Sequence, residues 1–376
     1  MPLRIALATS TAPARMETFI RHHVERLDHV ELVLAEGSLP TRMGDGRSIL
    51  PDGFVGRFKV RLRSAFVGKD WRQQLRERIA DLLREARIDV VLAEYGDVGS
   101  ELLPVCQALG IPIVPYFLGV DAYRNDILAR YHGHRELLQG AAAIVAVSNA
   151  IRAQLISLGA SPDRVIYNSC GADLERFKPC APGDAPPHFL AVGRFVEKKA
   201  PQNTIRAFAE VCRQRPSARL TFVGDGPLWD RCGALVEELG IADQVALVGR
   251  RSPDEVAALL KRSRAFVQHS VVSPTNDREG SPVALIEAMG SGVPVVSTRH
   301  GDIVELVGEE RGLLCDEGDV TGMAENLLRL VDHPEEAARM GAAAQEYVRA
   351  EHRVEDRIAA LQRVLEHAAA GLPVQG

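Results

Sequence analysis

Short apolar, β-branched runs alternate with amphipathic segments along almost the whole chain, and this alternation constrains the fold most. Between the runs lie segments of helical periodicity, such as residues 71–86. Strand–helix alternation of this kind predicts a doubly wound α/β sheet whose strands are buried and parallel. The first half of the chain holds six such runs: RIALAT, VELVLAE, DVVLAEY, IPIVPYF, AAIVAVS and RVIYNS.

A proline-rich segment, residues 178–188, divides the chain. Its sequence KPCAPGDAPPH is unsuited to a helix or a central strand, and we interpret it as a linker between domains. The alternation then resumes with FLAVGRF, RLTFVGDG, QVALVGR, RAFVQHS and PVVST. We therefore predict a Rossmann-like domain over residues 1–180, a second over 181–352, and a helix over 353–376 that packs back on the first domain. Two such domains facing each other across a cleft would suit a transferase with one substrate on each.

Composition and short motifs limit which partners, cofactors and locations the sequence suggests. A net charge of −5 over 376 residues gives no reason to expect a nucleic-acid partner. The six cysteines form no CxxC pair, and neither a D-x-D motif nor a histidine cluster occurs, so we expect no metal and no cofactor. The first residues do not have the pattern of a signal peptide, and no apolar stretch approaches the ~20 residues of a membrane-spanning helix. We expect a cytoplasmic protein, at most attached to the inner face of a membrane.

The segment REGSPVALIEAMGSGVPVVST places two carboxylates, Glu279 and Glu287, eight positions apart. Ser281 and Pro282 predict a helix start, with serine as the N-cap and proline as the first helical residue. Glu279 and Gly280 would then lie on the preceding loop. A helix N-terminus presents free N–H groups to phosphate, and carboxylates accept hydrogen bonds from paired hydroxyls. This arrangement suits a nucleotide sugar, although both acids could also be ordinary helix and loop residues.

Two cations follow the first predicted strand of the second domain, in the segment AVGRFVEKKA. Arg194 and Lys199 would lie on the loop at the carboxyl end of this strand. Together with a helix N-terminus they could neutralise a diphosphate as it leaves. The alternative is a solvated basic run, and we assign Lys198 to the surface.

The segment EGSPVALIEAMGSGVPVVST resembles the E-x7-E segment of retaining glycosyltransferases of family 4, which have the GT-B fold. Further segments match the family in order, and the resemblance covers most of the chain. It is strongest to the colanic-acid and amylovoran biosynthesis type. The matching segments are ATSTAPARMETFI, IVAVSNAIRAQLISLGASPDRVIYNSCGADLERF, AVGRFVEKKAP, FVGDGPL and DIVELV followed by RGLLCDEGD.

The resemblance implies roles for residues of this chain. Glu279 is expected to contact the hydroxyls of the donor sugar, and Glu287 to bind the ribose of the nucleotide. Arg194 and Lys199 match the pair that binds the diphosphate. Gly280, Ser281, Pro282 and Val283 match the loop and helix start near the phosphates and sugar, and Gly249, Arg250 and Arg251 match the region beside the base.

Two positions depart from the family pattern. Ala200 stands where the family has a glycine, and Leu118 in YFLGVD replaces a frequent histidine that is thought to contact sugar or acceptor. Asp121 of the same motif is retained. It is either a catalytic residue or the cap of the following helix.

The reaction implied is transfer of a sugar, with retained anomeric configuration, from a nucleotide diphosphate sugar to a hydroxyl of a glycan or lipid-linked acceptor in exopolysaccharide or cell-surface glycan synthesis. A nucleotide-sugar epimerase or a non-catalytic nucleotide-sugar binder of the same fold stays an alternative. A nicotinamide oxidoreductase would need G-x-G-x-x-G after the first strand, where this chain reads LATSTAPAR.

The stretch 57–88 is basic and carries interleaved aromatic residues. Such a segment suits an anionic membrane surface that holds a lipid-linked acceptor. A solvated helix face explains the same composition. Both interpretations stay open at this point.

Overall fold

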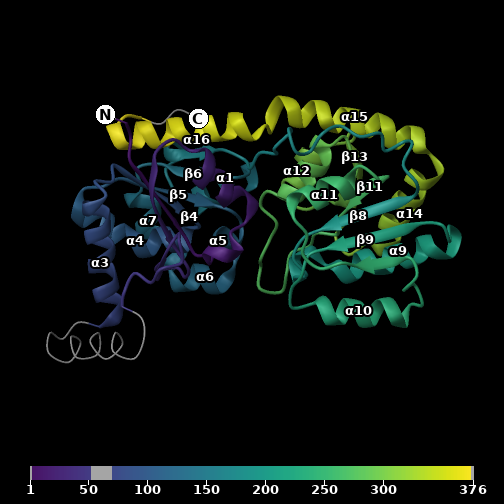
Figure 1. Ribbon diagram of the computed structural model, residues 1–376, viewed down its shortest axis with the longest axis horizontal. Coiled ribbons are helices and arrows are strands. Elements are labelled where there is room, and N and C mark those ends of the chain that lie inside the picture. The colour runs from purple at the N-terminus through teal and green to yellow at the C-terminus, as the bar shows by residue number, and fades with distance from the viewer. Residues whose placement is uncertain (1, 52–69, 374–376) are drawn as a thin grey trace. The chain divides into compact units, whose positions relative to one another are not determined.

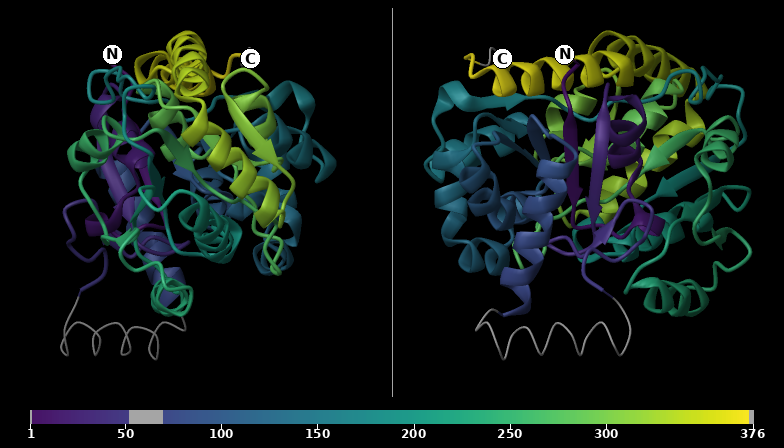
Figure 2. Two further views of the ribbon diagram at one scale, coloured as in Figure 1. Left: turned by 90° about the vertical axis from the view of Figure 1, so that its right-hand side faces the viewer. Right: turned by 60° about the vertical axis from the view of Figure 1, so that its left-hand side comes forward.

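The computed structural model describes residues 2–51 and 70–373 and divides into two compact units (Figure 1). The first unit comprises Met1–Ser169 together with Arg357–Gly376, and the second comprises Cys170–Asp356. Each unit contains one sheet, and Figure 2 shows these sheets enclosed by helices. Two Rossmann-like α/β units are therefore confirmed. The predicted boundaries at residues 180 and 352 stay predictions.

The sheet of the first unit has seven strands in the order β3-β2-β1-β4-β5-β6-β7. All neighbours pair in parallel except β3, which is antiparallel to β2. The six predicted runs all form strands; only the two-residue strand β3 was not predicted. The strands are β1 (Ile5–Thr9), β2 (Val30–Ala35), β3 (Arg42–Met43), β4 (Val90–Glu94), β5 (Ile113–Phe117), β6 (Ile144–Ala146) and β7 (Val165–Tyr167).

Helices connect these strands, as parallel pairing requires. Strands β1, β4 and β5 are buried along their whole length, which explains their continuous apolar sequences. The helices are α1 (Thr18–Arg26), α3 (Trp71–Glu85), α4 (Gly96–Leu109), α5 (Val120–Tyr123), α6 (Asn125–Arg130), α7 (Arg135–Gly140) and α8 (Asn149–Ser157).

The C-terminal helix α16 (Val354–Ala370) belongs in most of its length to the first unit. Asn168 donates a hydrogen bond from Nδ2 to the carbonyl oxygen of Arg357 at 3.1 Å. The Asp28 N–H donates to Oε1 of Gln362 at 3.2 Å. These contacts confirm that the last helix packs on the N-terminal domain.

The sheet of the second unit is parallel and has six strands in the order β10-β9-β8-β11-β12-β13. Five of them were predicted, and β13 was not. The strands are β8 (His188–Val192), β9 (Arg219–Val223), β10 (Val245–Leu247), β11 (Ala265–Val267), β12 (Val295–Thr298) and β13 (Gly312–Cys315). The helices are α9 (Pro201–Gln214), α10 (Trp229–Glu238), α11 (Pro253–Leu260), α12 (Val283–Gly290), α13 (Ile303–Val307), α14 (Val320–Asp332) and α15 (Pro334–Glu351).

Two hydrophobic clusters lie on the opposite faces of this second sheet. Phe189 of β8 joins Phe208 of α9 in one cluster. Its neighbour Leu190 joins Leu285 of α12 in the other. Because successive side chains of a strand point to opposite faces, a single strand serves both cores.

Helix α15 passes so close to the loop after α12 that it needs a glycine. A Cβ atom added at Gly341 would lie 2.0 Å from the carbonyl oxygen of Gly292. We therefore expect Gly341→Ala to lower the free energy of unfolding by about 1–3 kcal/mol, since backbone must move to admit the methyl group. Chemical denaturation monitored by circular dichroism measures this.

Gly233 provides the matched control, because it also lies inside a helix. The nearest atom to a Cβ added there is Cδ1 of Leu247 at 4.0 Å, an ordinary contact. Gly233→Ala should leave stability unchanged or raise it by roughly 0.5–1 kcal/mol through helix propensity. Equal effects of the two substitutions would contradict the close approach.

Candidate functional site

The loops after β8, β9 and β10 are joined by backbone hydrogen bonds at the carboxyl edge of the second sheet. Phe195 N–H donates to the Asp225 carbonyl at 2.8 Å, and Gly224 N–H donates to the Gly249 carbonyl at 2.9 Å. A Cβ atom at Gly224 would lie 1.9 Å from the carbonyl oxygen of Gly193, so only glycine fits. The predicted site residues on these three loops therefore come together at one edge.

Two arginines stand at this edge with their side chains in water. Arg194 is exposed. Arg250 lies with Nε 3.4 Å from Oδ2 of Asp225, and both of these side chains are more than half exposed. An exposed pair of this kind contributes little to stability. Both guanidinium groups are thus accessible to an anionic ligand, and Gly249 lies beside Arg250 with a left-handed φ of 71°.

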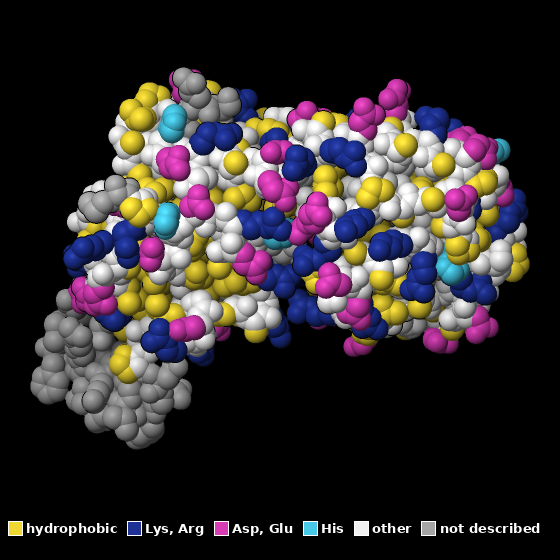
Figure 3. Space-filling view, turned by 45° about the horizontal axis from the view of Figure 1, so that its top comes forward, with side chains coloured by type: hydrophobic (Ala, Val, Ile, Leu, Met, Phe, Trp, Pro, Cys, Tyr) yellow, Lys and Arg dark blue, Asp and Glu magenta, His cyan; other side chains and the backbone are white. Residues whose placement is uncertain are grey.

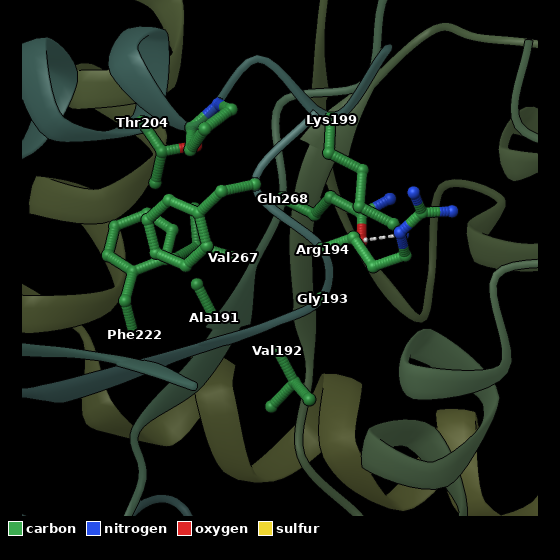
Figure 4. A pocket seen from close by; sticks show the side chains of 11 residues that line it. Ala191, Val192, Gly193, Arg194, Lys199, Thr204, Phe222, Val267 and Gln268 are labelled. Carbon is green, nitrogen blue, oxygen red and sulfur yellow. Dashed lines mark hydrogen bonds between the residues drawn. The ribbon is translucent and has the colours of Figure 1, made fainter. Parts of the chain in front are cut away.

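Lys199 ends a short 3-10 helix, Glu197–Lys199, and its side chain turns inward rather than into solvent. Its Nζ donates to Oε1 of Gln268 at 2.9 Å, as Figure 4 shows. The same nitrogen lies 2.9 Å from Oε2 of Glu279. Arg194, Lys199 and Gln268 line a pocket together with the apolar side chains of Phe222 and Val267, which lie to one side of them in Figure 4. This pocket is a candidate binding site in the second unit.

Glu279 is ionised although its side chain is only 10% exposed. Burial alone would raise the pKa of its carboxyl group, but the charges of Lys199 and Lys198 outweigh it and hold the pKa at about 2. Its Oε2 atom lies 2.9 Å from Nζ of Lys199, which leaves further lone pairs of the carboxylate to accept hydrogen bonds. A buried carboxylate with spare acceptor capacity is suited to receive a ligand hydroxyl.

Lys198 is not the surface residue that the sequence suggested. Its side chain is 17% exposed, and Nζ lies 3.0 Å from Oδ1 of Asp277. It also donates to the carbonyl oxygen of Arg278 at 3.1 Å. The tight turn of the 3-10 helix directs both lysines toward the loop of residues 271–282, so consecutive lysines share one side. Lys198 therefore anchors the loop that precedes α12.

The start of α12 differs from the prediction. The helix begins at Val283, and Pro282 occupies the N-cap position with ψ 89°, outside the helical range. Ser281 is therefore not the N-cap, and no side chain caps this end. The Pro282 carbonyl instead accepts the first helical hydrogen bond, from Leu285 N–H at 2.8 Å. The N–H groups of Val283 and Ala284, which precede this hydrogen bond, have no side-chain cap and are available to an anion.

The remaining predicted residues of this segment surround that helix start. Gly280 is buried and Ser281 is half-buried on the loop. Glu287 lies about one turn inside α12 and is 8% exposed. The structure thus brings Glu279 to Lys199 on the loop that leads into α12, while Glu287 lies one turn inside that helix. Their roles toward a ligand stay predictions.

Asp121 belongs to the first unit and is completely buried. Its Oδ2 accepts from Gly96 N–H at 2.8 Å, and its Oδ1 accepts from the N–H groups of Leu118 and Gly119 at 3.0 and 2.9 Å. Both oxygens therefore tie the end of β5 to the start of α4. Asp121 does not cap the following helix, because it lies inside α5, whose N-cap is Gly119 and has no side-chain cap. A catalytic role for Asp121 stays a prediction.

The basic stretch 57–88 is described only from residue 70 onward, and residues 57–69 lie outside the described part. Within α3, Arg72 and Arg76 both bind Glu101, at 2.5 and 2.8 Å. Figure 3 shows cationic and acidic side chains interspersed over the face in view. In the described ranges, no helix has both the length and the apolar character needed to cross a bilayer. The paired arginines suit a solvated helix face, and membrane attachment stays a prediction.

Burial raises the pKa of Asp121 to about 6 from 3.8, despite three N–H donors. The folded protein thus keeps this proton up to about pH 6, whereas the unfolded chain releases it near 3.8. The stability from this proton is present at low pH and is lost as pH rises through 6. Relative to Asp121→Asn, the wild type should lose on the order of 3 kcal/mol between about pH 4 and pH 7.

Denaturation of both proteins at the two pH values measures this change. Asp126→Asn serves as the control, because a hydrogen bond from Arg124 lowers the pKa of that exposed carboxyl to about 2. In the folded protein Asp126 is ionised at both pH values, so its substitution should have nearly the same effect at each. An Asp121→Asn effect independent of pH would refute the raised pKa.

Two models of known protein families match this chain. The family model Glycosyltransferase Family 4 matches residues 15–176, and the model Glycosyl transferases group 1 matches residues 175–347. Together the two models account for both Rossmann-like units.

The chain is also similar to individual glycosyltransferases. The putative colanic acid biosynthesis glycosyltransferase WcaL of Salmonella typhimurium is 31% identical over 65% of this chain, and the match spans 62% of its own length. The D-inositol 3-phosphate glycosyltransferase of Frankia alni is 30% identical over 68% of this chain and 69% of its own. HepE of Anabaena, solved in complex with UDP, has the same fold, with a TM-score of 0.73 and 16% identity over 97% of this chain and all of its own. The chain therefore belongs to glycosyltransferase family 4.

Proposed function

We propose that this protein transfers a sugar from a nucleotide diphosphate sugar to a hydroxyl group, with retained anomeric configuration. One observation carries the proposal: the buried carboxylate of Glu279 and the ammonium of Lys199 lie together, 2.9 Å apart, beside the uncapped start of α12. A sugar requires hydroxyl acceptors, and a diphosphate requires cations and free N–H groups. Both requirements are met within a few residues.

In this proposal the donor spans the carboxyl edge of the second sheet. Arg194, Lys199 and the first N–H groups of α12 bind the diphosphate, while Glu279 binds sugar hydroxyls. Gly249 and Arg250 lie on a neighbouring loop and would flank the base. Glu287, one turn into α12, would bind the ribose.

The chemical step needs positioning and charge stabilisation rather than a protein nucleophile. The bond from the anomeric carbon to the phosphate oxygen breaks, and a bond to the acceptor oxygen forms on the same face. The acceptor proton passes to the departing phosphate oxygen. Arg194, Lys199 and the helix start then stabilise the charge of the leaving diphosphate.

We further propose a glycan or lipid-linked acceptor and a role in exopolysaccharide or cell-surface glycan synthesis. The similarity to WcaL, whose name refers to colanic acid biosynthesis, supports this class. UDP in the HepE structure makes uridine nucleotides the first donors to test. The acceptor would bind to the first unit, where Leu118 replaces the frequent histidine of the family, and the protein would work in the cytoplasm or at the inner membrane face.

A thermal-shift screen over UDP-glucose, UDP-galactose, GDP-mannose and GDP-fucose tests the donor class. A ligand that binds only the folded protein raises its melting temperature by mass action. We expect one of these nucleotide sugars to stabilise the protein more than the others. Failure of all four would count against the proposed donor class.

Lys199→Ala should lower turnover of that donor by roughly 10²–10³-fold, because a preorganised cation is lost where the leaving charge develops. Release of nucleoside diphosphate, with glycan acceptors or with water alone, measures the rate. Lys261→Ala is the control, since Lys261 is exposed at the end of α11 and should not matter. Near-normal release by Lys199→Ala would refute the assignment, and product sugar nucleotide without any release would identify an epimerase.

A further inference from the structure

A buried histidine lies behind the carboxylate of the proposed donor site. His300 follows strand β12 and is 1% exposed. Its Nε2 atom accepts a hydrogen bond from the backbone N–H of Glu279 at 3.0 Å. The imidazole ring of His300 therefore fixes the backbone of Glu279, the residue whose carboxylate is proposed to bind the sugar.

Glu317 lies on the other side of the same ring. It follows strand β13, and its Oε1 is 2.5 Å from Nδ1 of His300. Because Nε2 accepts from a backbone N–H, it carries no proton, and Nδ1–H must donate to Glu317. The Glu317 carboxylate thus selects the tautomer that can receive Glu279. His300 acts here as a neutral bridge between a carboxylate and a backbone amide.

The same carboxylate also holds the beginning of the loop. Oε2 of Glu317 accepts from Val272 N–H at 2.9 Å. His269 fixes the segment that carries Glu317, because its Nε2 accepts a hydrogen bond from Gly318 N–H at 2.9 Å. The loop 271–282 is therefore held near its first residues by Glu317 and at Glu279 by His300.

We propose that His300 and Glu317 are positioning residues of the donor site. Neither group is placed on the ligand itself. They fix the backbone of Glu279, so that its carboxylate stays beside Lys199 and faces the sugar hydroxyls. This inference rests on the proposed function, and it assigns the pair to binding of the sugar rather than of the nucleotide.

The first test reads the hydrogen bond without any ligand. His300→Leu removes the acceptor of Glu279 N–H, so amide hydrogen exchange in a peptide covering residues 271–282 should become faster. His300→Gln retains an acceptor near the position of Nε2 and should restore much of the protection. His333→Leu is the matched control, because His333 also contacts a carboxylate, Glu335 at 3.2 Å, but on the surface. It should leave this exchange unchanged.

The second test separates sugar from nucleotide. For His300→Leu, we expect the Kd of the nucleotide sugar chosen by the thermal-shift screen to rise roughly tenfold or more, since a buried donor loses its partner and the loop rearranges. The Kd of the matching nucleoside diphosphate should stay within about twofold, because Arg194 has no contact with His300 and Lys199 keeps its hydrogen bond to Gln268. His300→Gln should recover much of the loss. Calorimetric titration of each protein with both ligands gives these values.

Two results would overturn the inference. In one, His300→Leu binds sugar nucleotide and nucleoside diphosphate as the wild type does, or loses affinity for both equally. In the other, amide exchange in the loop of residues 271–282 is the same in His300→Leu as in the wild type. If the wild type binds none of the nucleotide sugars, the proposed function itself fails. The exchange experiment still reports, in that case, whether His300 holds the backbone of Glu279.

Discussion

The ion pair between Lys199 and Glu279 is the interaction on which the candidate site depends. Their side chains are only 16% and 10% exposed, so both charges have lost most of their hydration. The cost of removing two ions from water is offset only when each finds further partners. Lys199 also donates to Gln268, and Glu279 lies within the field of Lys198. A ligand that brings its own negative phosphates and sugar hydroxyls could take over both groups.

The need to keep the charges of Lys199 and Glu279 together explains why several hydrogen bonds hold the loop that carries Glu279. A buried carboxylate is useful only if it stays within reach of its cation, because a displaced ion would be buried without a partner. Lys198 holds Asp277 in the middle of the loop, and His300 holds Glu279 at its end. Glu317 fixes both His300 and Val272. The loop is therefore held by hydrogen bonds rather than by regular secondary structure.

The sequence predicted most of the fold because buried parallel strands are continuous apolar runs. The exceptions show the limits of that signal. Strand β3 has two residues, Arg42 and Met43, which is too short for any periodicity. Strand β13 begins with Gly312, where a Cβ atom would lie 2.2 Å from the Val295 carbonyl, so close packing placed a poor strand former in the sheet.

The candidate site was predicted in part. Arg194, Lys199 and Glu279 could be placed because each follows a predicted strand or precedes a predicted helix. Their supporting partners could not, because hydrogen-bond partners from other strand ends leave no local pattern; His300 lies 21 residues from Glu279. The serine–proline pair led to a wrong prediction of the helix start. Pro282 has a ψ outside the helical range, so Pro282 rather than Ser281 occupies the N-cap position.

The polar residues that follow β11, β12 and β13 (His269, His300 and Glu317) offered a signal for these partners, since polar residues at the carboxyl ends of parallel strands gather at the ligand edge of such sheets. The most direct measurement of the central claim is a crystal structure of the protein soaked with the nucleotide sugar that binds it best. The account predicts the diphosphate between Lys199 and the first turn of α12, with a sugar hydroxyl on Glu279. A ligand bound elsewhere, with Lys199 and Glu279 still paired and untouched, would contradict it.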